Sequence, residues 1–530
     1  MSAHASGEGP QAGPQAGQRS GRQLDQGNGG AGGPDVRYGT SRGRWVLLAC
    51  VLGSGMAQLD GTVVNVALPR IGADLHAGLT SLQWTVNAYT LTLAGLLLLG
   101  GSLGDRLGRR RIFVLGVGWF AVASALCAAA PTAQVLIAAR GLQGVGGALL
   151  TPGSLAILEA VFVRTDRAAA VGAWSGLGGV ATAFGPVLGG VLVELGSWTW
   201  RLVFLINLPL AVVVMLVATR HVPETRDASA TGRLDIPGAV LAALGLGGVV
   251  LGLTEGPSTG FGPRAVTAIG VGVAALAAFL VLEARRSNPM LPLTLFSSRQ
   301  FSSANLVTFA VYAALGGGLF LLPLQLQRVA GYRPVAAGSS LLPITLVMLL
   351  LSARAGRLAG RIGPRLPMTV GPLLAAAGLL LLRRVGPHAD YLTDVLPGVV
   401  VLALGLAATV APLTSTVLAA APERSAGVAS AVNNDVARTG GLLAVAVLPG
   451  LAGITAADYA VPAALSAGYR TALVIAAGLV ALGGVLSFLT IRTDLLAAGD
   501  DPEASPPDEA AGGPVSHCAI TGPPLQTSRP

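Results

Sequence analysis

Two long uncharged segments separated by a short polar one are the feature that most constrains the fold of this chain. Residues 88–100 and 112–130 hold no charged side chain, whereas Gly101–Ile112 between them holds Asp105 and four arginines. Charged side chains cost several kcal/mol or more in hydrocarbon, and twelve residues are too few for a domain. The sequence therefore predicts a tight loop that joins two membrane-spanning helices.

The composition excludes a soluble protein of this length. Hydrophobic residues make up 52% of the chain and charged residues 11%, with a mean hydropathy of +0.68, whereas soluble domains carry about 25% charged residues. The net charge of +9 comes entirely from arginine. These arginines are scattered through short predicted loops instead of forming one basic surface, so they indicate membrane topology and no nucleic-acid partner.

The three cysteines and the two chain ends add little chemistry. Cys50 and Cys127 lie in apolar runs and Cys518 in a polar tail, so we expect neither a disulfide framework nor a zinc set, and no cofactor. Residues 1–43 and 493–530 are polar and rich in glycine, proline and alanine. We expect both segments to be disordered cytoplasmic tails.

Membrane-spanning helices need about 20 mostly apolar residues, and the chain holds fourteen candidates. The arginine bias between alternate loops places both termini in the cytoplasm, as expected of a multi-pass protein of the cytoplasmic membrane. Asp435 and Arg438 interrupt the thirteenth span. The predicted spans are residues 45–68, 84–103, 112–130, 134–158, 168–193, 200–219, 236–254, 265–283, 302–325, 335–353, 366–382, 395–418, 427–452 and 471–491.

The loop at 101–112 has a second copy near residue 360. Asp105 is replaced there by Gly360, and both copies occupy the same place in a six-helix unit once the spans at 236–283 are set aside. This repeat predicts two six-helix bundles, 44–219 and 301–492, with two extra helices inserted in a linker at 220–300. The residues that recur are Gly101, Leu103, Arg106, Gly108 and Arg110, which return as Gly356, Leu358, Arg361, Gly363 and Arg365.

Four segments, at 59–69, 101–112, 136–148 and 179–190, resemble motifs of the major facilitator superfamily, specifically its fourteen-helix drug:proton antiporter branch. The resemblance covers about residues 45–491 and implies an all-α polytopic membrane fold. It also implies that the 101–112 loop is a latch that holds the two bundles in one orientation; the alternative is that its arginines only set topology. The latch residues are Gly101, Gly104, Asp105, Arg106, Gly108, Arg109 and Arg110.

Two deep charges lie in the first and fourth predicted helices. Asp60 precedes Pro69 by nine residues and Arg140 follows Pro131 by nine, which puts each charge about 13 Å from the outer end of its own helix. Because the two helices run in opposite directions, the charges can share one depth in the membrane. The resemblance associates the segment around Arg140 with proton transfer. Either Asp60 exchanges a proton whose affinity Arg140 tunes, or the two form a permanent structural ion pair.

The segment at 179–190 resembles the antiporter motif, which is found mainly among exporters. Its small residues favour close helix packing. The motif residues are Gly179, Gly185, Pro186, Gly189 and Gly190.

Asp435 and Arg438, three residues apart, lie on one face of the thirteenth span. They are either a second proton-coupling site or an internal ion pair that lets the helix insert. Polar and aromatic residues expected near the membrane midplane are candidates for substrate binding between the bundles. These are Gln58, Asn65, Asn87, Tyr89, Gln143, Trp174, Asn305, Tyr312 and Gln325.

The leading hypothesis is a secondary transporter, driven by the proton gradient, that exports hydrophobic or amphipathic drugs or antibiotics in exchange for protons. We expect a monomer whose partners are a small hydrophobic substrate, protons and the lipid bilayer. A chain without lysine cannot form a Walker ATP-binding loop. The alternatives are a dedicated exporter of one endogenous metabolite or antibiotic and, less favoured for want of a histidine cluster or catalytic triad, a membrane enzyme.

Overall fold

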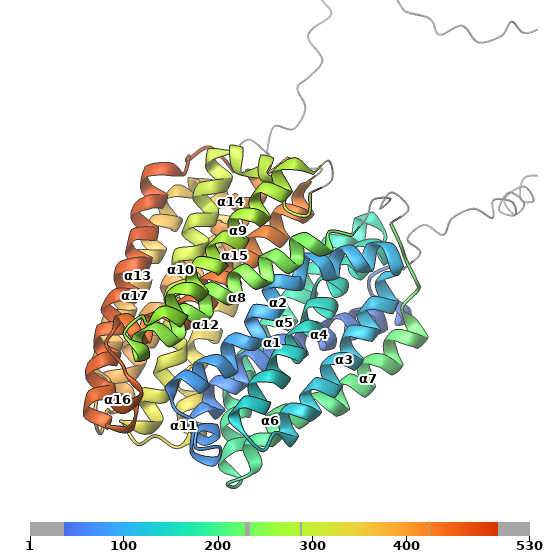
Figure 1. Cartoon of the computed structure of the whole chain (residues 1–530). Coiled ribbons are helices and arrows are strands. Elements are labelled where there is room, and N and C mark those ends of the chain that lie inside the picture. Colours follow the sequence, from blue (N-terminus) through green and yellow to red (C-terminus); the bar gives the residue numbers. More distant parts are fainter. Residues whose placement is uncertain (1–35, 228–233, 287–288, 423–424, 497–530) are drawn as a thin grey trace, which may run out of the picture.

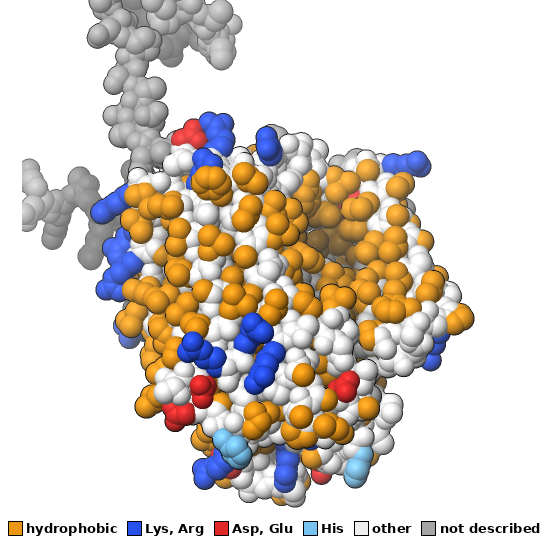
Figure 2. Space-filling view, turned by 90° about the vertical axis from the view of Figure 1, so that its left-hand side faces the viewer, with side chains coloured by type: hydrophobic (Ala, Val, Ile, Leu, Met, Phe, Trp, Pro, Cys, Tyr) orange, Lys and Arg blue, Asp and Glu red, His pale blue; other side chains and the backbone are white. Residues whose placement is uncertain are grey.

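The computed structural model describes residues 36–227, 234–286, 289–422 and 425–496. Within these ranges the chain is helical, and the β-structure is one isolated bridge between Val36 and Phe162. Long helices run side by side in two groups (Figure 1). Hydrophobic side chains cover much of the face in Figure 2, where a hollow with hydrophobic walls opens between two lobes. The all-α membrane fold predicted from the sequence is confirmed.

The helices lie where hydropathy places them but extend beyond the predicted spans at most ends, because hydropathy marks only the part of a helix that hydrocarbon surrounds. In chain order they are α1 (Ser41–Asp74), α2 (Leu79–Leu107), α3 (Arg109–Ala129), α4 (Ala133–Val161), α5 (Arg164–Glu194), α6 (Leu202–Leu205), α7 (Asn207–His221), α8 (Ile236–Thr259), α9 (Pro263–Arg285), α10 (Arg299–Arg328), α11 (Pro334–Ser339), α12 (Leu342–Ile362), α13 (Arg365–Leu381), α14 (Leu396–Ala419), α15 (Ala426–Leu451), α16 (Ala456–Ala460) and α17 (Pro462–Thr490).

Thirteen of the described helical segments are long and apolar enough to cross a membrane. The remaining predicted span, the thirteenth in chain order, is α15, whose polar run from Asn433 to Arg438 lowers its hydropathy. This helix nevertheless packs along α10 and also contacts α2 and α8. The difference from the predicted count of fourteen therefore reflects the charges in α15 and not a missing helix.

The first tail is shorter than predicted. Val36 donates its backbone N–H to Val161, and its carbonyl accepts from Val163, while the Thr40 hydroxyl caps α1 by accepting from Gly43. Residues 36–43, predicted to be disordered, are therefore ordered, because these backbone groups find partners at the end of α4. Residues 1–35 and 497–530, the rest of the predicted tails, lie outside the described residues.

Helices α1–α7 pack with one another, as do α10–α17, while the α8–α9 hairpin lies against α2 and α15. Small residues let α8 approach its neighbours closely. A β-carbon built on Gly95 of α2 would lie 3.0 Å from that of Ala243 in α8, and one built on Gly248 would lie 2.8 Å from the carbonyl oxygen of Ala268 in α9. Such close approach is typical of membrane helices. The inserted hairpin therefore covers the seam between α2 and α15.

The two copies of the repeated loop share a backbone conformation. Gly108, between α2 and α3, has φ +116°, and Gly363, between α12 and α13, has φ +83°. Side chains other than glycine rarely adopt these angles. Both loops lie at one end of the molecule, which we call the arginine-rich end, defined by residues 101–112 and 356–365; the other is the opposite end.

Candidate functional site

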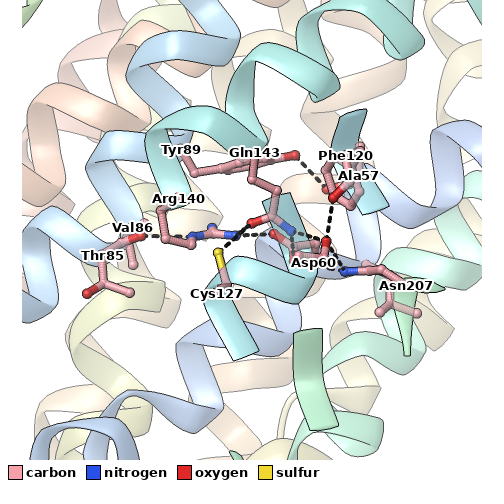
Figure 3. Close-up of polar contacts among 12 residues, drawn as sticks. Ala57, Asp60, Thr85, Val86, Tyr89, Phe120, Cys127, Arg140, Gln143 and Asn207 are labelled. Carbon is pink, nitrogen blue, oxygen red and sulfur yellow. Dashed lines mark hydrogen bonds and ion pairs between the residues drawn. The ribbon is translucent and has the colours of Figure 1, made fainter. Parts of the chain in front are cut away.

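A buried polar cluster occupies the centre of the first bundle (Figure 3). Asp60 of α1 is 0% exposed and forms an ion pair with Arg140 of α4, which is 1% exposed. This contact confirms that the two charges share one depth. Because a buried ion loses its hydration, each charge needs several polar partners to remain ionised.

The cluster supplies those partners. One Asp60 oxygen (Oδ1) accepts from the amides of Gln143, at 2.9 Å, and Asn207, at 3.3 Å. Arg140 donates to the Thr85 carbonyl at 3.0 Å through Nε and to Gln143 Oε1, and its guanidinium lies 4.3 Å from the centre of the Tyr89 ring. All groups that hold Asp60 donate to it, so this arrangement fits the ionised carboxylate.

Sequence reasoning missed two members of this cluster, Ser124 in α3 and Asn207 in α7. The Ser124 hydroxyl accepts from Gln143 at 2.8 Å and from Asn207 at 3.3 Å. Both are buried and each stands in an otherwise apolar run. A single polar residue within an apolar run could have identified each of them as a candidate. The sequence, however, does not determine which way each side chain points.

Asp435 and Arg438 do not form the predicted internal ion pair. Asp435 Oδ1 and Arg438 Nε are buried and have no hydrogen-bond partner, and the ion pairs of the described residues do not include either side chain. The spacing places both residues on one helical face but does not bring a short aspartate side chain into contact with the guanidinium. One buried polar atom of each side chain thus lacks a hydrogen-bond partner among the described residues.

A cavity of about 480 Å³, which we call the vestibule, opens towards the arginine-rich end. Its walls come from α2, α4 and α15, with Trp174 of α5, and its rim includes Asp105, Arg109 and Asp235. Ala431 and Asn434 of α15 line the vestibule. Asp435 lies four residues after Ala431, and Arg438 lies four residues after Asn434, so each charged residue is about one helical turn deeper. The vestibule therefore leads towards Asp435 and Arg438.

The nine predicted substrate-binding residues separate into groups, and of these only Trp174 lines the vestibule. Tyr89 and Gln143 belong to the Asp60 cluster. Asn65 and Asn87 carry buried amide atoms that have no hydrogen-bond partner in the described part of the chain, and Tyr312 is partly buried against the core. The other three make contacts within a bundle: Gln58 with Thr182, Asn305 with Asn433, and Gln325 with Val385 and Ser466.

Helices α5 and α11 close the molecule at the opposite end through the glycines of the predicted antiporter motif. A β-carbon built on Gly190 would lie 2.6 Å from the carbonyl oxygen of Pro334, and one built on Gly189 would lie 2.8 Å from that of Val63 in α1. Gly185 also packs against α1, and the Pro186 carbonyl contacts Gly338, whereas Gly179 has open space beside it. An ion pair of 2.6 Å between Glu194 and Arg333 adds to the closure.

The 101–112 loop is held within its own bundle. Asp105 pairs with Arg109 at 2.7 Å, and its carbonyl accepts from the Asp227 N–H at 2.9 Å. Glu224 accepts from the Arg110 N–H at 3.1 Å and lies 3.7 Å from the Arg111 guanidinium. These contacts join the loop to the segment that follows α7, while Asp105 faces the vestibule.

Comparison with known proteins identifies the class. Residues 50–445 match the family described as the Major Facilitator Superfamily, and the chain belongs to that family. It is 37% identical over 488 residues to the puromycin resistance protein pur8 of Streptomyces alboniger, covering 89% of this chain and 95% of the relative. It is 35% identical over 404 residues to the multidrug resistance protein Stp of Mycobacterium tuberculosis, covering 76% and 74%.

The fold agrees with solved structures of transporters. A bacterial homolog of the human lysosomal transporter Spinster, in an inward-facing and unoccupied conformation, matches with a TM-score of 0.64 and 18% identity. The match covers 87% of this chain and 99% of that chain. At this identity the likeness establishes the fold only.

Proposed function

We propose that this protein is a proton-coupled antiporter that exports hydrophobic or amphipathic compounds across the cytoplasmic membrane, with its arginine-rich end and both termini in the cytoplasm. The buried Asp60–Arg140 pair is the main support for this proposal. Ionisable side chains inside a membrane bundle are rare and energetically costly, so they usually mark a functional site. The vestibule, open towards the arginine-rich end and closed at the other, provides the path from the cytoplasm. The names of the relatives supply the class of cargo.

In this mechanism Asp60 is loaded with a proton in the state open to the outside and releases it in the state open to the inside. Protonation removes the charge that holds Arg140 and adds an O–H donor to Asp60, so Arg140, which can only donate, must rearrange with it. Since Asp60 lies on α1, which packs against the glycine face of α5, this rearrangement acts on the helix that closes the outer end. The ion pair described above is then the deprotonated state.

The relatives support two breadths of substrate. One is a puromycin resistance protein and the other a multidrug resistance protein, so a dedicated antibiotic exporter is the second candidate. Everted membrane vesicles incubated with a panel of fluorescent dyes and antibiotics test both. We expect uptake that an uncoupler abolishes; uptake that ignores the proton gradient would refute the antiporter. Transport of one compound from the panel would favour the dedicated exporter.

Asp105→Ala should slow turnover more than it weakens substrate binding. In the structure Asp105 organises the loop through Arg109, and we propose that it engages the second bundle when the vestibule closes. We expect the maximal transport rate to fall at least about tenfold with KM within about threefold, because the change removes an interaction of one conformation only. Asp494→Ala, which removes a similar aspartate–arginine pair on the surface after α17, is the matched control. Equal maximal transport rates in both variants would contradict the proposed role of the 101–112 loop as a latch.

A further inference from the structure

A second pair of buried carboxyl groups lies at the arginine-rich end of the inserted hairpin, outside the Asp60 cluster. Asp235 is the N-cap of α8 and is 7% exposed, while Glu283, in the last turn of α9, is 1% exposed. They are 48 residues apart in sequence and meet because α8 and α9 are antiparallel. Carboxyl groups are rarely this buried without a counter-charge or a proton.

Each carboxyl group has one satisfied oxygen and one orphaned oxygen. Asp235 Oδ1 accepts from the Gly238 N–H at 2.8 Å and lies 3.0 Å from the Arg286 guanidinium. Glu283 Oε2 accepts from the Leu291 N–H at 2.8 Å. Asp235 Oδ2 and Glu283 Oε1 are both buried and have no hydrogen-bond partner among the described residues, and Arg286, which contacts Asp235, follows Glu283 by only three residues.

Two carboxylates beside one guanidinium leave a net charge of −1, and one proton between the carboxyl groups neutralises it. The proton also supplies the donor that the two orphaned oxygens lack. A metal ion does not fit equally well, because two carboxylates are a small ligand set and Arg286 would repel a cation; the described residues hold no group of three potential metal ligands.

We propose that Asp235 and Glu283 bind one proton between them and that this proton fixes the linker after α9 to the inserted hairpin. The linker is attached because Leu291 donates to Glu283, and Pro289 and Met290 line the vestibule beside Asp235. The site is therefore a clasp in the vestibule wall, and it is independent of the coupling role proposed for Asp60.

The charged groups around the clasp define its environment. On its own elements Arg286 contacts Asp235, while Arg285 is exposed. Across the vestibule, α2 presents Asp105 and Arg106, α3 presents Arg109 and α4 presents Glu159. Asp105 is itself paired with Arg109, and Arg286 is the cation in direct contact with Asp235.

The shared proton predicts how stability changes with pH. At neutral pH the folded protein holds a proton that both carboxyl groups of the unfolded chain have lost, since ordinary carboxyl pKa values are about 4. Because the folded state then binds more protons, stability falls as pH rises. We expect the melting temperature of the purified full-length protein in detergent to fall between about pH 5 and about pH 8, with the clasp contributing at least about 2 °C.

Glu283→Gln tests this directly, because a glutamine amide donates to Asp235 at every pH. We expect the variant to lose that part of the pH-dependent fall, and to lose the infrared carbonyl band of a protonated carboxyl group that the wild type shows at neutral pH. Glu255→Gln, at the other end of α8 and paired with Arg264, is the matched control and should keep both.

The same melting curve and the same infrared band in Glu283→Gln and wild type would overturn the proposal. If Glu283→Gln does not fold, Asp235→Asn provides the same test, because asparagine also caps helices well. Neither measurement needs substrate or a proton gradient, so their outcome does not depend on whether the protein is an antiporter.

Discussion

Asp60→Asn will reduce efflux driven by a proton gradient to the level of vesicles without the protein. Asparagine keeps the shape of the side chain and an acceptor for Gln143 and Asn207, but it cannot take up or release a proton. It also leaves Arg140 as a buried charge without its partner, which costs about 3–5 kcal/mol of stability. The measurement is dye transport in everted vesicles under an imposed pH gradient, with the amount of protein in the membrane determined in parallel.

A double variant, Asp60→Asn with Arg140→Gln, distinguishes the two interpretations of the pair. Removing both charges relieves the unpaired guanidinium, so stability should largely return in either case. If the pair is only structural, gradient-driven efflux returns with it. If Asp60 carries the proton, efflux remains absent, while exchange of labelled for unlabelled substrate, which needs no net proton movement, persists.

Asp74→Asn is the matched control for these variants. Asp74 is on the same helix and pairs with Arg201 at 2.8 Å, but both side chains are partly exposed. Such an ion pair contributes about 0–1 kcal/mol. We expect normal transport from this variant. If Asp74→Asn also lost transport, α1 would tolerate no change of charge, and the Asp60→Asn result could not be assigned to proton coupling.

The sequence predicts the helices and one depth in the membrane because both depend on length along the chain. Spans follow from the thickness of hydrocarbon, and the meeting of Asp60 with Arg140 follows from their equal distances to two prolines. Asn207 and Ser124 were not predicted as members of the cluster, because their place in it depends on how α7 and α3 are rotated about their axes. The packing of many side chains determines that rotation. The hydropathy of a helix does not predict its rotation about its own axis.

Contacts between distant segments account for the rest. The position of the inserted hairpin depends on the close approach of Gly95 to Ala243, and the clasp between Asp235 and Glu283 depends on the pairing of two helices. The spacing of Asp435 and Arg438 correctly gives a shared helical face yet gives the wrong contact. Local periodicity fixes which residues share a face, and only the assembled bundles fix what each side chain meets.

Gly190→Ala will cause a large loss of efflux, because it places a β-carbon where α5 meets α11 at the outer end. That carbon would lie 2.6 Å from the Pro334 carbonyl oxygen and 2.7 Å from the Val335 Cα, both backbone atoms that cannot move aside easily. Overpacking of this kind costs about 1–3 kcal/mol. Since the clash exists only when the outer end is closed, the cost shifts the balance between the two conformations by about 5–150-fold.

The motif provides its own control for this prediction. Gly179→Ala makes the same chemical change in the same helix at a position with open space around it, so its efflux should stay within about twofold of wild type. Gly338→Ala, on the opposing helix α11 against Pro186, should reproduce the loss seen with Gly190→Ala, because both carbons obstruct one interface from its two sides. Efflux from vesicles with equal amounts of each variant decides the matter: if Gly190→Ala and Gly179→Ala transport equally well, the glycine face of α5 does not form the outer closure.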